Sequence, residues 1–147
     1  MATFLLDTNL LLRLSDGASP HQALADQAIK RLRLRGDRLC LTAQNLIEFW
    51  AVATRPAPAN GFGWDTQKTR VEIDQLLNKF PLLDDMPAIL TNWINLVTTH
   101  GVKGKKVHDA RLVAVMQAHG VTHLLTFNTD DFKGYSGITL VHPSDVN

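Results

Sequence analysis

The chain has 147 residues, of which 45% are hydrophobic, and a formal net charge of +1 at pH 7. This length suits a single domain spanning residues 1–147 and leaves no room for a second domain of ordinary size. The balanced charge excludes a basic surface spread over the whole molecule, so any contact with a nucleic acid must depend on local positive charge.

The cellular setting follows from three observations. Cys40 is the only cysteine and lies in an apolar run, so an intrachain disulfide is impossible and a reducing compartment is favoured. The segment 1–12 lacks a basic start and is interrupted by Asp7, which makes it a poor signal peptide. No uncharged apolar stretch approaches the roughly 20 residues that span a bilayer. We therefore expect a soluble, cytoplasmic protein with no membrane partner.

In the first half of the chain, short apolar runs alternate with helical patterns. A strand is predicted over about 3–6, and a helix over about 20–35, with Ser19 as its N-cap and Gly36 at its end. A second strand over 38–41 leads to Thr42, which is expected to cap the next helix.

That helix runs through Ala53, and Pro56 prevents its extension. Residues 55–64 form the one long loop, and Asp65 is predicted to cap the helix that follows it.

The second half repeats the alternation of strands and helices. Strands are predicted over 80–83, 123–126 and 138–141, and helices from Asp85 and Pro87 to about Gly101 and from 107 to 119, with Gly120 closing the last. Alternation of this kind is typical of βαβ units. We predict an α/β fold, a three-layer α/β/α sandwich with a mostly parallel central sheet.

Three acidic residues lie where a parallel sheet would gather them. Asp7 ends the first strand, Glu48 lies in the second turn of the helix after the second strand, and Asp109 lies in the first turn of a later helix. Function in open parallel sheets collects beyond the carboxyl ends of the strands. Clustered carboxylates repel one another, so a bound cation is the natural way to stabilise them.

The ion that suits oxygen ligands of this kind is a hard divalent cation, Mg²⁺ or Mn²⁺. Such an ion could polarise a phosphodiester and activate water, which predicts a metal-dependent phosphoryl-transfer site. Each acid also has a purely structural interpretation. Asp7 could cap a turn, Asp109 could stabilise a helix N-terminus, and Glu48 could be a solvated helix residue.

Four segments together resemble the ordered motifs of PIN-domain proteins. They are Leu5-Leu6-Asp7-Thr8-Asn9-Leu10-Leu11, Asn45-Leu46-Ile47-Glu48-Phe49, Val107-His108-Asp109-Ala110-Arg111-Leu112 and Leu124-Leu125-Thr126-Phe127-Asn128-Thr129-Asp130-Asp131-Phe132. The stretch 50–63 is similar to a subgroup of VapC-type toxins. The resemblance covers nearly the whole chain.

This resemblance implies a Mg²⁺- or Mn²⁺-dependent endoribonuclease, the toxin of a type II toxin-antitoxin pair. Asp7 and Asp109 would be the principal metal ligands. Glu48 would complete the catalytic triad, either as a ligand through water or as an aid to water activation. Thr8 and Asn9 would steady Asp7 or touch the substrate. The implied partners are RNA, a small antitoxin and a second copy of the chain.

The fourth motif departs from the most acidic version of the family pattern. Asn128 stands where many relatives carry Asp, and Asp130 and Asp131 are displaced along the loop. We place Asn128 in the catalytic set and Asp131 among the substrate contacts. Which residue fills the fourth acidic position, and whether one or two ions bind, stays open.

Two basic segments are candidate contacts for the RNA backbone. The loop 102–106 precedes the Asp109 helix and includes Lys106, while Arg13 follows the first motif. A solvated loop explains these lysines almost as well. Phe62 and Trp64, in the Gly-rich loop, form either a partner-binding patch or a folded-back lid.

Two alternative functions remain. A receiver-like signalling domain also binds Mg²⁺ through aspartates, with Asp84 as a weak phosphoacceptor candidate. A non-catalytic PIN-like RNA-binding or scaffold domain is the other, because the fourth acid is missing.

Overall fold

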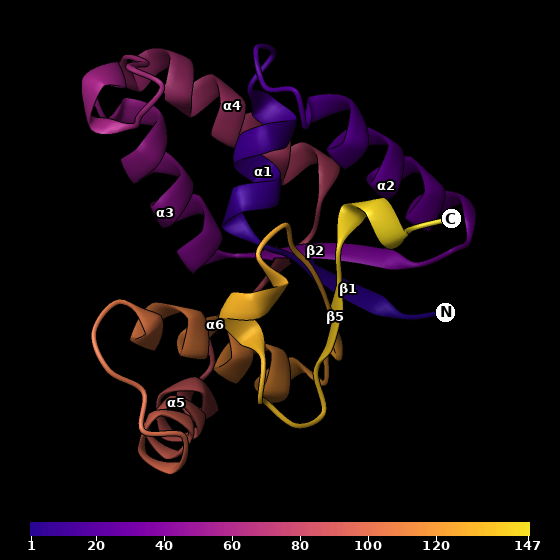
Figure 1. The fold of residues 1–147 in the computed structure, drawn as a ribbon, viewed down its shortest axis with the longest axis vertical. Helices are drawn as coiled ribbons and strands as arrows, with labels where there is room; N and C mark the ends of the chain where they lie inside the picture. The colour runs from indigo at the N-terminus through magenta and orange to yellow at the C-terminus, as the bar shows by residue number, and fades with distance from the viewer.

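Five parallel strands form the central sheet of the computed structural model, which describes residues 1–147 (Figure 1). The strands are β1 (Thr3–Leu6), β2 (Arg38–Thr42), β3 (Leu82–Leu83), β4 (His123–Leu125) and β5 (Thr139–Val141), and their order in the sheet is β3-β2-β1-β4-β5. The first strand therefore lies at the centre, with its carboxyl end flanked by those of β2 and β4.

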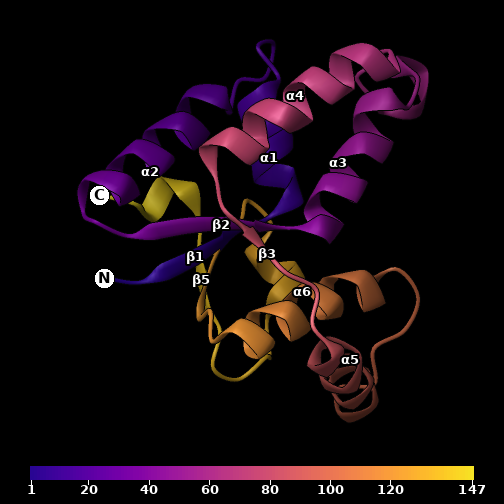
Figure 2. The ribbon, with the colours of Figure 1, turned by 180° about the vertical axis from the view of Figure 1, so that it is seen from behind.

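Six α-helices cover the two faces of the sheet (Figures 1 and 2). They are α1 (Thr8–Ser15), α2 (Gln22–Leu34), α3 (Ala43–Thr54), α4 (Thr66–Lys79), α5 (Pro87–Thr99) and α6 (Lys106–His119), with short 3₁₀ turns η1 (Ala57–Ala59), η2 (Thr129–Phe132) and η3 (Pro143–Asp145). The first four lie on one side and α5 and α6 on the other. The predicted three-layer sandwich is confirmed, and its sheet is parallel throughout.

The alternation of side chains along β1 divides the interior into two cores. Phe4 and Leu6 point into the core beneath α1 to α4, whereas Leu5 points into the core against α5 and α6. Cys40 belongs to the second core, where its Sγ donates to the Phe4 carbonyl at 3.2 Å. Burial raises the pKa of this thiol to about 11, which agrees with an inert structural cysteine.

Three predicted helix ends are confirmed. The Thr42 hydroxyl accepts from the Asn45 amide in a capping box at the start of α3, and Asp65 accepts from the Lys68 amide at the start of α4. Gly120 ends α6 with a φ of 67°, a left-handed conformation that glycine adopts without strain.

Other predicted boundaries are wrong. The second helix begins at Gln22, because Ser19 caps a preceding turn, its Oγ accepting from the His21 amide. No helix was predicted directly after Asp7, yet α1 begins there and its first amide donates to the Asp7 carboxylate. For the helix predicted to start with Asp85 and Pro87, the Pro87 start is confirmed, but its N-cap is Met86 and Asp85 lies outside it.

The long loop 55–64 folds back over the end of α3, which is one of the two arrangements predicted for Phe62 and Trp64. The Trp64 ring lies 5.0 Å from that of Phe62 and 6.2 Å from that of Phe49, measured between centroids, and both loop rings pack against the core. Gly61 makes this path possible. A Cβ placed there would lie 1.9 Å from the Arg55 carbonyl oxygen.

None of the helices combines the length and the apolar character that crossing a membrane requires.

Candidate active site

The sheet brings the three predicted acids into one pocket of about 350 Å³. Asp7 follows β1, Glu48 reaches the pocket from the second turn of α3, and Asp109 from the first turn of α6. The pocket therefore lies beyond the carboxyl end of the central strand, where the topology of the sheet predicts a site.

The Asp7 carboxylate is held by three hydrogen bonds and is only 5% exposed. Its Oδ1 accepts from the Thr8 amide at 2.8 Å, and its Oδ2 accepts from Asn9 Nδ2 at 2.8 Å and from the Thr126 hydroxyl at 2.7 Å. Burial, helped by the charges of Glu48 and Asp131, nonetheless outweighs these hydrogen bonds and raises the pKa of Asp7 to about 6. The side chain is fixed in place but carries unrelieved negative charge.

Glu48 is positioned by hydrogen bonds at both oxygens. The Thr8 hydroxyl donates to its Oε1 at 2.7 Å and in turn accepts from Asn45 Nδ2 at 3.1 Å. Gln44 Nε2 lies 3.3 Å from Glu48 Oε2. Thr8 therefore connects the first acidic motif to the second.

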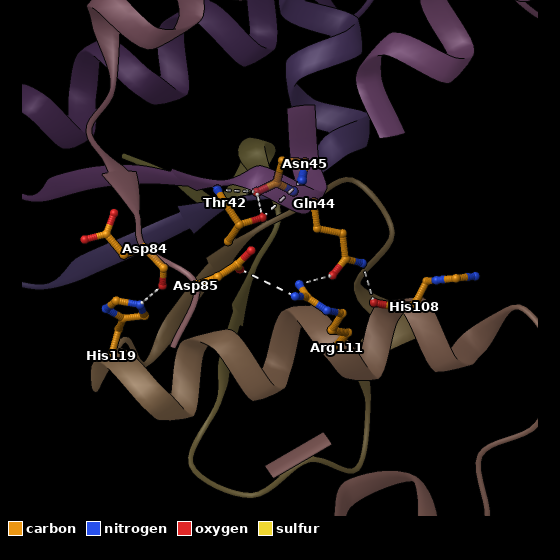
Figure 3. A network of polar contacts seen from close by, with 8 residues as sticks. All are labelled: Thr42, Gln44, Asn45, Asp84, Asp85, His108, Arg111 and His119. Carbon is orange, nitrogen blue, oxygen red and sulfur yellow. Dashed lines mark hydrogen bonds and ion pairs between the residues drawn. The ribbon is translucent and has the colours of Figure 1, made fainter. Parts of the chain in front are cut away.

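Gln44 also joins α3 to the start of α6 (Figure 3). Its Nε2 donates to the His108 carbonyl at 2.7 Å, and its Oε1 accepts from Arg111 Nη1 at 3.1 Å. The His108 ring points away from these contacts and is exposed. This bridge fixes the helix turn that carries Asp109 relative to the one that carries Glu48.

Asp109 differs from both, because its carboxylate has no hydrogen-bond or ion-pair partner. Partial burial raises the pKa of Asp109 to about 7, and the charges of Asp7, Asp131 and Glu48 add to this effect, while Lys106 opposes it. A partly buried carboxylate without partners, facing other carboxylates, has its oxygens available for a cation.

The fourth motif contributes two residues to the pocket, Asn128 and Asp131. They are three positions apart around η2, and residues at this spacing share one side of a 3₁₀ turn. Asp130 lies between them and instead pairs with Lys133. The amide at 128 is therefore accompanied by a carboxylate at 131.

The two basic residues predicted to contact RNA lie outside the pocket. Arg13 is exposed and does not line the pocket, and Lys106 lines a neighbouring cavity together with Asp131. Arg55 lines the pocket but was not predicted. It follows the last residue of α3 in an extended conformation, so helical spacing does not place it, and no local signal in the sequence could have found it.

The donor set fits a hard cation that keeps part of its hydration shell. Every polar side chain that lines the pocket, apart from the Arg55 guanidinium, offers carboxylate, hydroxyl or amide oxygen. No three His, Cys, Asp or Glu side chains lie close enough together to hold an ion by themselves. Mg²⁺ in proteins is usually bound by one or two carboxylates and several waters, so this arrangement suits it better than a full protein cage would.

Comparison with known proteins agrees with this geometry. The family model for the PIN domain matches residues 4–138, so the chain belongs to the PIN-domain family. A search of curated protein sequences gives no match.

Solved structures of toxin-antitoxin proteins share the fold. The VapBC2 complex of Rickettsia felis, bound to a promoter DNA fragment, is 13% identical with a TM-score of 0.72, covering 95% of this chain and 98% of that one. A toxin-antitoxin complex from Klebsiella pneumoniae is 24% identical with a TM-score of 0.66, covering 97% and 98%. VapC20 of Mycobacterium tuberculosis, a toxin that cleaves the sarcin-ricin loop, is 16% identical with a TM-score of 0.62, covering 92% and 98%. The chain therefore has the fold of VapC-type toxins.

The receiver-like alternative does not fit this fold. Asp84, its candidate phosphoacceptor, follows β3, which is an edge strand of two residues. The acids that share a pocket follow or flank the central strand instead.

Proposed function

We propose that this chain is a Mg²⁺- or Mn²⁺-dependent endoribonuclease that hydrolyses RNA phosphodiester bonds, in one nuclease domain over residues 1–147. The observation that carries the proposal is the meeting of Asp7, Glu48, Asp109 and Asp131 in one pocket, with the Asp109 carboxylate unpaired. Membership of the PIN-domain family supports it.

In this proposal Asp7 and Asp109 hold the ion, and Glu48 contacts its water shell. A bound divalent ion supplies polarisation of the phosphodiester and a more acidic water. Thr8, Asn9 and Thr126 keep the Asp7 oxygens oriented. The site therefore does not have to reorganise during the reaction.

Two further side chains are proposed to act on the substrate. Asn128 orients a water or a phosphate oxygen through its amide without adding charge. The Arg55 guanidinium is suited to a phosphate oxygen, since arginine binds phosphate with paired hydrogen bonds.

Cleavage of RNA by the purified protein tests this function. We expect cleavage with Mg²⁺ or Mn²⁺, none with EDTA, and a loss of at least about 100-fold in Asp109→Asn and Asp7→Asn, because a metal site needs its charged ligands. Asp74→Asn is the matched control, since it removes one exposed carboxylate on α4 that lines neither this pocket nor the neighbouring cavity. If Asp109→Asn cuts as fast as this control, the assigned site is wrong.

A non-catalytic RNA-binding domain is the second candidate, favoured by the amide at position 128. It predicts that the wild-type chain binds RNA but does not cut it with any divalent ion.

The proposed partners are a small antitoxin and a second copy of this chain. The similar structures from Rickettsia felis and Klebsiella pneumoniae are toxin-antitoxin complexes, which supports the first. Where a short reading frame adjoins the gene of this chain, co-expression with its product should suppress cleavage and yield a stable complex. Unchanged cleavage at saturation would count against the toxin assignment, and sedimentation of the free chain would show whether it dimerises.

A further inference from the structure

A second cavity, of about 380 Å³, adjoins the carboxylate pocket, and Asp131 lines both. We call it the lysine cavity, because Lys103, Lys106 and Lys133 line it. Its walls come from the loop between α5 and α6 and from the segment after β4, which Figure 1 shows on the same side of the sheet. The rings of His100 and Tyr135 and the carboxylate of Asp130 also line it. Of the residues that line this cavity, the proposed function uses only Asp131.

The carboxylates of the pocket repel RNA unless positive charge lies close to them. Four carboxylates and one guanidinium line the pocket, and the chain as a whole carries only +1. An RNA strand brings one negative charge with each phosphate, so it is repelled there unless positive charge lies close by. Bound divalent ions offset part of this repulsion, and neighbouring lysines are the remaining source.

Two of these lysines are available for the purpose. Lys103 and Lys106 are exposed and form no ion pair, whereas Lys133 pairs with Asp130. The charge of Lys106 lowers the pKa of Asp109, opposing the carboxylates, and the charge of Asp109 helps burial to raise the pKa of Tyr135. The groups of the two cavities therefore lie within electrostatic reach of each other.

The rings offer a different kind of contact. The centroids of His100 and Tyr135 lie 4.8 Å apart, with the ring planes at 59°. Aromatic side chains beside a positive groove are the usual platform for unstacked bases, and this contact is available only in single strands and loops.

We propose that the lysine cavity binds one nucleotide of a single-stranded RNA next to the scissile phosphodiester. Lys103 and Lys106 contact its phosphate, and the Tyr135 ring stacks on its base. This inference rests on the proposed function, which it deepens by assigning the contacts of one nucleotide to the residues of the lysine cavity.

Removal of the two unpaired lysines tests the phosphate contact. The double variant Lys103→Ala/Lys106→Ala is compared with Lys30→Ala/Lys79→Ala, which removes the same charge from α2 and the end of α4. Binding of a short single-stranded oligoribonucleotide is measured against salt in an Asp109→Asn background with Mg²⁺, so that cleavage does not interfere.

We expect the salt slope of the cavity variant to fall by about 1.4, at about 0.7 for each lost contact with a single strand. At about 0.1 M salt this corresponds to binding that is up to about 25-fold weaker. In the cleaving protein, the same change should raise KM and leave kcat unchanged, because the contact is equal in ground and transition states.

The base contact is tested at Tyr135. Tyr135→Leu should weaken binding at least about 5-fold, whereas Tyr135→Phe, which keeps the ring, should bind as wild type does. A duplex of the same sequence should not respond to either change.

The two proposals fail in different ways. If the wild-type chain does not cleave RNA, the nuclease function is refuted. The binding measurements still show whether the lysine cavity binds single-stranded RNA. If it cleaves, and the cavity variant matches the Lys30→Ala/Lys79→Ala control in KM and salt slope, the lysine cavity is not a substrate site.

Discussion

Replacement of Asp109 by asparagine should stabilise the protein when no divalent ion is present. The neutral amide keeps the shape of the side chain and removes a charge that has no partner and faces Asp7, Glu48 and Asp131. The pKa of Asp109 is raised from 3.8 to about 7. About three units at 1.36 kcal/mol each give about 4 kcal/mol, which we halve for partial exposure to solvent, leaving about 2 kcal/mol at pH 8.

The assay is urea unfolding in EDTA at pH 8, with Asp130→Asn as the control. Asp130 is exposed on η2 and pairs only with the exposed Lys133, so we expect its replacement to change the free energy of unfolding by less than about 0.5 kcal/mol. Added Mg²⁺ should then stabilise the wild type by mass action and have little effect on Asp109→Asn. If Asp109→Asn is no more stable than wild type in EDTA, the carboxylates do not repel one another as described.

The same repulsion sets the direction of the pH dependence. Because the folded pKa of Asp109 lies above its unfolded value, the folded state binds the proton more tightly. In EDTA the wild type should therefore gain stability as the pH falls from about 7 to about 4, with Asp7 acting in the same direction from about 6. Asp109→Asn should show a shallower dependence.

Three further outcomes follow from single contacts. Gln44→Leu breaks the bridge between α3 and α6, so it should lower the free energy of unfolding in urea by about 1–2 kcal/mol and slow RNA cleavage, with the fold intact. Unchanged cleavage would show that the bridge does not position the site. Gly61→Ala should cost about 3 kcal/mol or more, since its Cβ would meet the Arg55 carbonyl, whereas Gly17→Ala, with open space around it, should be nearly neutral. Cys40 should resist alkylation in the native state and react after unfolding, as its burial and raised pKa require; rapid native labelling would contradict its place in the core.

The predictable part of the fold was the part with local signals. Apolar runs, the Thr42 and Asp65 caps and Gly120 each act within a few residues, so the sequence locates them well. The α1 helix was missed because its apolar residues, Leu10 to Leu12, form a short continuous run. A continuous apolar run has no period that distinguishes a strand from a helix. Only the capping role of Asp7 separates the two elements.

The residues of the site also divide into those with a local signal in the sequence and those without one. The residues that end strands or open helices were found, since strand ends converge in any parallel sheet. Arg55 was missed because its place in the pocket depends on where α3 ends and how the following loop folds back. The choice between Asp130 and Asp131 required the 3₁₀ geometry of η2, which turns one toward the pocket and the other toward Lys133.

The position of β1 in the middle of the sheet affects when the pocket can form during synthesis. The Thr126 hydroxyl that orients Asp7 follows β4 and lies 119 positions later in the chain. Asp109, Asn128 and Asp131 also come late in the chain. A chain still attached to the ribosome has the first acid without the groups that orient and surround it. The pocket can therefore form only after the segments that carry Asp109, Thr126 and Asp131 have been added.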